Sequence, residues 1–259
     1  MRQKAILLAA STGILLSCVS SDACAQDQAK PIAPDDPRLT FSFAIQPGGP
    51  PFQFKVKLKS DGTIAGVAVY RNTESRSFQE LPSCMESPDQ VDENWGWGDL
   101  SNLIAHADLN FDGNQDLELI QNYIPHLGKK LYCVFLWDPK TAKFAYSADL
   151  TNISANVEAN PGKKTLTTRE DWQGGAWQSS TYRWRGDKLE MIEQTSLLGD
   201  WGLTPPPNEC NFTFTCSRLV NGKMVTTLEK PVCTVKEMEN LPNCPSSPKP
   251  ASGQNYNRQ

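Results

Sequence analysis

The chain has 259 residues, of which 39% are hydrophobic and 21% are charged, and its formal net charge at pH 7 is −4. A chain of this length and apolar content can bury a full hydrophobic core. The excess of acidic residues makes nucleic acid a poor partner.

The first 25 residues have the pattern of a secretory signal peptide. Arg2 and Lys4 precede an apolar run from residue 5 to residue 19, and the small-residue stretch Ala23-Cys24-Ala25 follows. The apolar run is too short to span a bilayer comfortably, and nothing downstream matches it. We therefore expect a protein that is exported to the periplasm or secreted, with residues 1–25 removed.

The segment Leu15-Leu16-Ser17-Cys18 offers an alternative, a lipoprotein cleavage box that would leave a lipidated Cys18 and a membrane anchor. Cysteine counting favours cleavage after Ala25, because it leaves six cysteines, an even set suited to an oxidising compartment. Cleavage before Cys18 leaves Cys24 without an obvious partner.

After Ala25 the chain carries 25 − 2 = 23 Lys and Arg and 29 − 1 = 28 Asp and Glu, so the mature protein is acidic.

The mature chain is expected to hold one folded domain between two disordered segments. Residues 26–38 and 246–259 lack an apolar periodicity, which indicates a disordered linker and a disordered tail. Residues 39–245 contain short alternating or aromatic runs separated by Gly, Asp and Asn turns, too closely spaced for helices. We predict an all-β domain, an antiparallel β-sandwich or barrel over about 39–198. A disulfide-bearing C-terminal hairpin, 204–244, closes or extends it.

Two hairpins can be registered from their turn residues. The first turns at Asp61-Gly62, and its predicted pairs are Leu58 with Ala65, Val56 with Val67 and Phe54 with Val69. The side chains of Lys55, Lys57 and Lys59 then lie on the opposite face, as expected for a sheet with one solvent-exposed face. The second turns at Gly186-Asp187, and its predicted pairs are Trp184 with Leu189, Tyr182 with Met191 and Arg183 with Glu190.

A third hairpin, turning at Asn221-Gly222, predicts a disulfide. Counting outward from Val220 opposite Lys223 places Cys210 opposite Cys233. A bulge near Pro231 could shift this match by one residue. The scheme is one of 15 possible connectivities for six cysteines. Its other two pairs are Cys216 with Cys244 and Cys84 with Cys133.

Residues 108–116, Asp-Leu-Asn-Phe-Asp-Gly-Asn-Gln-Asp, match the calcium-loop pattern D-x-N-x-D-G-x-x-D. Ca²⁺ takes six to eight oxygen ligands, and alternate residues of a tight loop can direct side chains at one point. Gly113 permits the sharp turn. The predicted Ca²⁺ ligands are the side chains of Asp108, Asn110, Asp112 and Asp116 and the backbone carbonyl of Asn114.

This loop does not have the pattern of an EF-hand. Its twelfth position is Leu119, where an EF-hand needs a bidentate Glu. The flanking runs 103–105 and 117–120 resemble strands. We therefore predict a strand-loop-strand calcium site with a structural role. The alternative is an acidic turn that binds no metal.

No catalytic constellation is found in the sequence, and we expect that the protein is not an enzyme. There is no Ser-His-Asp spacing, nucleophile elbow or phosphate loop. His106 is interpreted as a packed or hydrogen-bonded residue rather than an acid-base catalyst. Tryptophans beside glycines can form binding surfaces or pack in the core. The two histidines of the sequence are His106 and His126, and the tryptophans beside glycines are Trp95, Trp97, Trp172 and Trp177.

Three segments, 108–117, 136–144 and 182–189, resemble periplasmic lysozyme-inhibitor-like immunity proteins, which protect bacteria from peptidoglycan-cleaving toxins of rival cells. Residues 218–223 give weaker support. The resemblance implies a β-barrel-like fold with bound Ca²⁺ and a lysozyme-like peptidoglycan hydrolase as partner, inhibited by a loop inserted into its cleft. No inhibitory residues are carried over, because the Ser-Gly-x-x-Tyr loop of some other lysozyme inhibitors is absent. Ala142 stands where a turn Gly is expected, and the cysteine-rich end lies outside the pattern. The alternative is a calcium-stabilised adhesion or glycan-binding module of the cell envelope.

Overall fold

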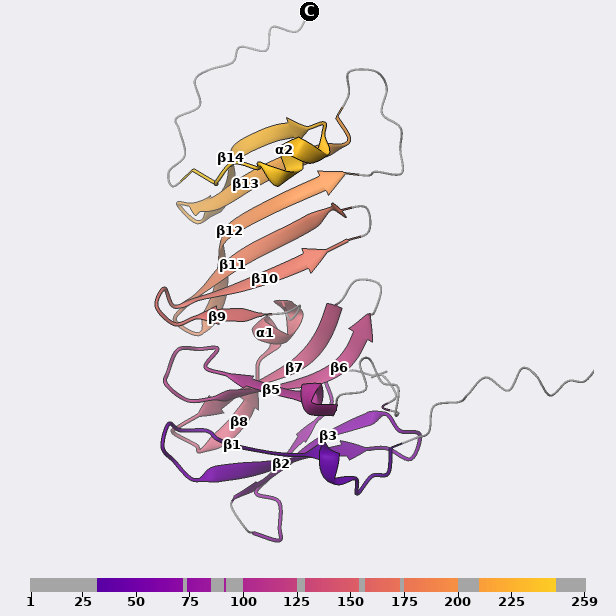
Figure 1. The fold of residues 1–259 in the computed structure, drawn as a ribbon. Coiled ribbons are helices and arrows are strands. Elements are labelled where there is room, and N and C mark those ends of the chain that lie inside the picture. The colour runs from indigo at the N-terminus through magenta and orange to yellow at the C-terminus, as the bar shows by residue number, and fades with distance from the viewer. Residues whose placement is uncertain are drawn as a thin grey trace, which may run out of the picture.

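The fold is known from a computed structural model that describes residues 32–71, 74–84, 91, 100–124, 129–153, 157–172, 175–199 and 210–245 (Figure 1). The predicted signal peptide, the Cys18 box, the 246–259 tail, His126, Trp95 and Trp97 lie outside these residues. Within them, no helix is both long and apolar enough to cross a membrane.

The described chain forms three antiparallel sheets, which confirms the predicted all-β class. The first sheet has the order β1-β2-β3-β4 and contains β1 (Thr40–Ala44), β2 (Pro51–Leu58), β3 (Ile64–Arg71) and β4 (Gln79–Pro82). The second has the order β5-β6-β7-β8 and contains β5 (Ile104–Ala107), β6 (Asp116–Ile124), β7 (Lys129–Asp138) and β8 (Lys143–Tyr146).

The third sheet is six-stranded, with the order β14-β13-β12-β11-β10-β9. Its strands are β9 (Glu158–Asn160), β10 (Thr165–Asp171), β11 (Trp177–Arg185), β12 (Lys188–Gly199), β13 (Phe212–Val220) and β14 (Lys223–Val232). The short helices are η1 (Pro37–Leu39), η2 (Leu100–Leu103), α1 (Ala148–Ile153) and α2 (Val235–Glu239).

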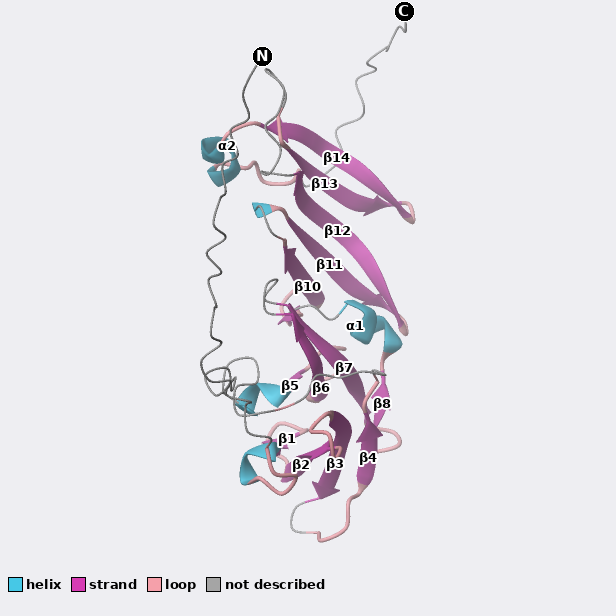
Figure 2. Ribbon diagram, turned by 90° about the vertical axis from the view of Figure 1, so that its right-hand side faces the viewer, coloured by secondary structure: helices cyan, strands magenta, loops and turns pink. Residues whose placement is uncertain are grey.

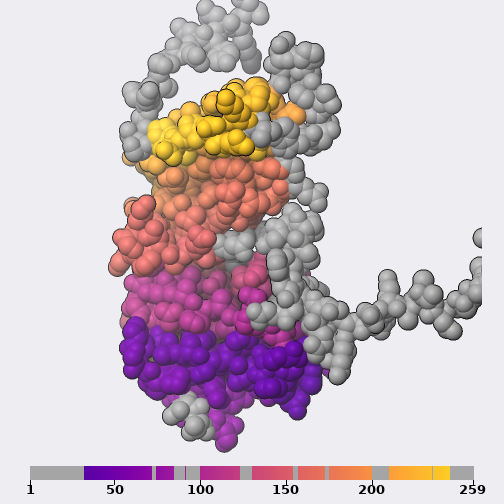
Figure 3. Space-filling model, in the orientation of Figure 1, coloured from indigo at the N-terminus to yellow at the C-terminus, as the bar shows by residue number. Residues whose placement is uncertain are grey.

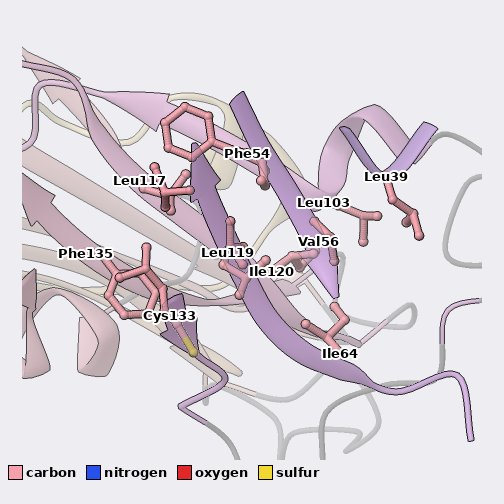
Figure 4. Close-up of a cluster of buried hydrophobic side chains, with 14 of the residues drawn as sticks. Leu39, Phe54, Val56, Ile64, Leu103, Leu117, Leu119, Ile120, Cys133 and Phe135 are labelled. Atoms are coloured by element: carbon pink, nitrogen blue, oxygen red, sulfur yellow. The ribbon is translucent and has the colours of Figure 1, made fainter. Parts of the chain in front are cut away.

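The first two sheets share one hydrophobic core, as Figure 4 shows. Phe54 and Val56 of β2 lie in it with Leu117 and Leu119 of β6, and all four side chains are fully buried. The alternation of apolar and polar residues along β2 and β6 therefore produces a sandwich.

The six-stranded sheet continues from this sandwich, so that the molecule is elongated, with β1–β4 at one end and β13–β14 at the other (Figures 1, 2 and 3). A small core joins the two parts. It contains Val134 of β7, Leu150 of α1 and Leu166 of β10, with Trp184 and Leu189 packed against it. At the far end, β13, β14 and α2 have a separate core around Phe212 and Phe214.

The sandwich ends at β8, earlier than predicted, and β11 and β12 belong to the six-stranded sheet, which the hairpin β13–β14 extends. The physical reason lies on β7, whose residues Val134 and Leu136 point away from the sandwich core. This second apolar face needs cover, and the chain after β8 supplies it through α1 and β10.

The registers of the first two predicted hairpins agree with prediction at all but one of the predicted pairs. Val56 pairs with Val67 and Phe54 with Val69, whereas Leu58 pairs with Ile64 and not with Ala65. A bulge between Lys57 and Leu58 causes this shift. All three predicted β11–β12 pairs, Trp184 with Leu189, Tyr182 with Met191 and Arg183 with Glu190, are present.

The three predicted disulfides are confirmed: Cys84–Cys133, Cys210–Cys233 and Cys216–Cys244. Val220 pairs with Lys223 as predicted, and the irregularity in this hairpin lies at Cys216 rather than beside Pro231. It shifts the register by one residue from the predicted count, so that Phe212 pairs with Val232. Three disulfides indicate an oxidising compartment outside the cytoplasm.

Part of the predicted disordered linker is ordered. Ile32 is 4% exposed and belongs to the sandwich core, and Asp36 caps η1 by accepting a hydrogen bond from the backbone N–H of Arg38. One buried apolar side chain and one helix cap thus fix residues 32–38, although the composition of 26–38 resembles that of a linker.

Candidate metal centre and the adjoining hollow

The predicted calcium loop connects the paired strands β5 and β6, where Ala107 lies opposite Asp116. The flanks are therefore strands, as predicted. Phe111 and Gly113 have φ angles of 60° and 90°, so the backbone turns left-handed twice within three residues. This tight curl brings the alternating polar side chains over the loop.

Asp108, Asn110 and Asp112 are folded back onto the loop's own backbone. The carboxylate of Asp108 accepts hydrogen bonds from the N–H groups of Asp112 at 3.0 Å and Gly113 at 2.9 Å. The side-chain oxygen of Asn110 accepts from Asp112 N–H at 3.1 Å, and Asp112 Oδ1 accepts from Asn114 N–H at 2.8 Å. These contacts hold the three side chains against the loop, and their role as Ca²⁺ ligands stays a prediction.

Asp116 has a different position from the other acids of the loop. It is 0% exposed, and its two oxygens accept hydrogen bonds from the N–H groups of Leu109 and Trp137, both at 2.8 Å. Burial raises the pKa of Asp116 to about 7, with smaller contributions from the charges of Asp112 and Asp108, against the opposing effect of the two N–H groups. Asp116 thus ties the loop to β7, a role that the sequence did not predict.

The loop fits a calcium ion in part. Among the described residues, no three His, Cys, Asp or Glu side chains are placed to hold a metal ion. The oxygens that the loop itself offers are the carboxylates of Asp108 and Asp112, the amide of Asn110 and the carbonyl of Asn114, an all-oxygen set of the kind that Ca²⁺ prefers. Asp116, also a predicted ligand, is buried, and both of its carboxyl oxygens accept hydrogen bonds from backbone N–H groups.

The loop is also attached to the six-stranded sheet. Trp184 Nε1 on β11 donates a hydrogen bond to the carbonyl oxygen of Leu109 at 2.8 Å. Leu109 is fully buried, and Phe111, Leu136 and Trp184 pack around the same small core. The three segments that carry the family resemblance, 108–117, 136–144 and 182–189, therefore meet at one place.

A hollow of about 640 Å³ opens beside this junction. The predicted calcium loop, the end of β8, the start of α1 and the β11–β12 turn all contribute to its lining, which includes Asn110, Asp112, Tyr146, Asp149, Trp184 and Lys188. A second hollow of about 420 Å³, between β4 and β8, is lined by apolar groups that include Leu81, Phe135 and Phe144. Tyr146 lines both hollows and is 50% exposed.

Three of the other residues singled out from the sequence lie in described regions. The ring of His106 stacks on Phe43 with centroids 4.1 Å apart, and its Nδ1 lies 3.0 Å from Gln115 Oε1. Trp172 and Trp177 pack against the core at the α2 end. All three side chains are therefore packed, which is the interpretation given for His106 and the core alternative given for the tryptophans.

Tyr146, Asp149 and Glu118 were missed by sequence reasoning. Glu118 alternates with Leu117 and Leu119, and this pattern predicts a solvent-facing position. The structure instead leaves it 6% exposed, next to Val134 of β7, which packs against Leu150 of α1 and Leu166 of β10. The only signal in the sequence that could have pointed to Tyr146 and Asp149 was their position shortly after the 136–144 segment.

Comparisons with known proteins add little to this site. No family model matches the chain, and no curated protein matches it significantly. A solved structure described as "Structure of a Xanthomonas Type IV Secretion System related protein" is similar to this chain with a TM-score of 0.48 and 16% identity, covering 76% of this chain and 97% of the other. This likeness is too distant to carry an argument.

Proposed function

We propose that this chain is a periplasmic, calcium-stabilised inhibitor of a lysozyme-like peptidoglycan hydrolase, acting as an immunity protein and not as an enzyme. The observation that carries the proposal is the meeting of the three resembling segments around the loop and hollow, joined by the hydrogen bond from Trp184 to Leu109. This hydrogen bond joins residues that are 75 positions apart in the sequence.

A rigid frame also supports the proposal. Stoichiometric inhibitors gain affinity when their binding surface is formed before the partner arrives, because less conformational entropy is lost on association. Here the disulfide Cys84–Cys133 links the two sheets of the sandwich, and Asp116 fixes the loop to β7.

The inhibition assay measures turnover of a peptidoglycan suspension by a panel of purified lysozyme-like hydrolases. The panel includes any exported hydrolase encoded beside the gene for this chain. We expect one of these enzymes to be suppressed at a near 1:1 ratio. Unchanged turnover across the whole panel with excess protein would contradict the proposal.

The calcium part of the proposal has a separate test. Ca²⁺ bound by Asp108, Asn110, Asp112 and the Asn114 carbonyl would stabilise the folded state by about 2.7 kcal/mol at 100-fold excess over Kd. For a chain of this size that corresponds to a rise in Tm of roughly 5–11 °C. Asp112→Asn is expected to abolish the rise, and the exposed Asp187→Asn is its matched control. A Tm that is the same in Ca²⁺ and in chelator would refute the calcium site.

A second function, a glycan-binding module of the envelope, is favoured by the chemistry of the larger hollow. Tyr146 and Trp184 lie there beside Asp149 and Asn110, and aromatic rings with polar groups suit a sugar ring. A glycan binder keeps its affinity for soluble polysaccharide when no enzyme is present, whereas an inhibitor shows affinity only for the enzyme.

A further inference from the structure

We infer that the Tyr146 surface is where this protein binds its partner hydrolase, and that the partner presents a basic patch beside an apolar side chain. The Tyr146 surface is defined as Tyr146 together with the two hollows that it lines, represented by Asp187 and Trp184 on one side and by Leu81 and Phe144 on the other. The inference rests on the proposed function and names the part of the molecule that performs it.

The first argument is the exposure of Tyr146. Half of its surface is open to solvent, although its ring contacts Phe135 edge to face with centroids 5.9 Å apart. A tyrosine held by a core ring and flanked by two hollows is a rigid amphipathic anchor of the type that dominates binding energy at protein interfaces. The hollows can receive side chains of the partner on both sides.

The second argument is charge. Apart from Asp112, whose charge the proposed Ca²⁺ would offset, the charged side chains that line the larger hollow are Asp149 and Asp187 against Lys188, two acids and one base. An enzyme that acts on an anionic cell wall benefits from a basic surface, because long-range attraction raises its local concentration at the wall. An acidic surface on the inhibitor is complementary to such an enzyme and speeds the encounter.

The third argument is rigidity. Asp149 Oδ2 accepts a hydrogen bond from Leu189 N–H at 3.2 Å, which joins α1 to β12. The side chain of Gln79 on β4 bonds to both the carbonyl and the N–H of Phe144, at 2.8 and 2.9 Å. The side chains that line the two hollows therefore need little reordering when a partner binds.

The other exposed large hydrophobic residues of the described chain are less suited to this role. Leu198, Met224 and Val225 lie at the far end, and the last two are on the edge strand β14. That strand contains Lys223 and Pro231 and a register shift, devices that keep an edge strand from pairing.

The test compares four substitutions in the inhibition assay, with fold checked by circular dichroism and Tm. Tyr146→Ser is expected to weaken inhibition about 30-fold or more, the effect of a hot-spot residue. Asp187→Lys is expected to weaken it about tenfold and mainly to slow association, with a smaller effect at high salt. The matched controls Val225→Ser and Glu229→Lys at the far end are expected to stay within about twofold of wild type.

Lys188→Glu makes the surface more acidic and is expected to tighten inhibition several-fold, which is an independent check. If wild type inhibits and all three surface variants behave like the controls, the inference is overturned and the proposed function stands. If wild type inhibits no hydrolase, both the inference and the proposed function fail. If wild type binds soluble peptidoglycan strands without enzyme and Tyr146→Ser loses this binding, the surface takes a glycan and the assignment of a protein partner is wrong.

Discussion

Replacing Glu118 by glutamine is expected to stabilise the metal-free protein at pH 8 and to leave its stability nearly unchanged at pH 4. Glu118 lies opposite Ala105 and Val134 on the covered face of β6, and it is 6% exposed. Burial raises the pKa of its carboxyl from 4.5 to about 7. The charged form is therefore disfavoured in the folded state.

The sign follows from proton binding. Below pH 4.5 the carboxyl is protonated in both folded and unfolded chains, so it has no pH-dependent effect on the free energy of unfolding. As pH rises from 4.5 to 7 the unfolded chain loses this proton first, and the folded state loses stability relative to it. The gap between about 7 and 4.5, at 1.36 kcal/mol per pH unit, corresponds to about 3 kcal/mol above pH 7.

Glutamine has nearly the same shape and cannot ionise, so Glu118→Gln is expected to recover these 3 kcal/mol at pH 8. The measurement is urea unfolding in chelator at both pH values, and chelator keeps the loop metal-free. Glu229→Gln on the exposed part of β14 is the matched control and should change little at either pH. An equal gain for Glu118→Gln at pH 4 and pH 8 would refute the reasoning, because it would come from packing and not from ionisation.

Two further variants test how the parts of the molecule are joined. The disulfide Cys84–Cys133 spans 49 residues, and the chain-entropy relation gives about 4 kcal/mol for it, so a Cys84→Ala, Cys133→Ala double variant should unfold at correspondingly lower urea. A loss below about 1 kcal/mol would contradict its role as a link between the two sheets. Trp184→Phe removes the hydrogen bond to Leu109 and some packing, and should cost about 1–3 kcal/mol and weaken Ca²⁺ binding measured by calorimetry. Unchanged Ca²⁺ affinity would show that β11 does not support the loop.

Short-range features were predictable because their causes are local. A two-residue turn with glycine fixes which residues near it lie opposite each other, so the predicted β11–β12 pairs followed from counting. The β13–β14 register follows the count only as far as Ser217, and the disulfide Cys210–Cys233 forms although the register beyond is shifted by one residue. The left-handed turns at Phe111 and Gly113 likewise belong to a loop whose pattern is written in nine residues. The β2–β3 register failed only at its bulge, where Gly66 is approached so closely by the backbone of β4 that a Cβ atom would meet the Leu81 carbonyl.

The sequence by itself thus determined the all-β class, most of the predicted hairpin pairs and the polar loop between β5 and β6, whereas the predicted disulfide scheme was one of 15 and was selected only by the tertiary structure. The stacking of the three sheets was decided only by the tertiary structure, because covering the second apolar face of β7 is a long-range requirement that no local pattern expresses. That stacking buries Glu118, turns Asp116 inward onto two backbone N–H groups and brings Tyr146 and Trp184 to one hollow. Sequence alternation predicts which residues share a face of a strand, whereas burial depends on what covers that face.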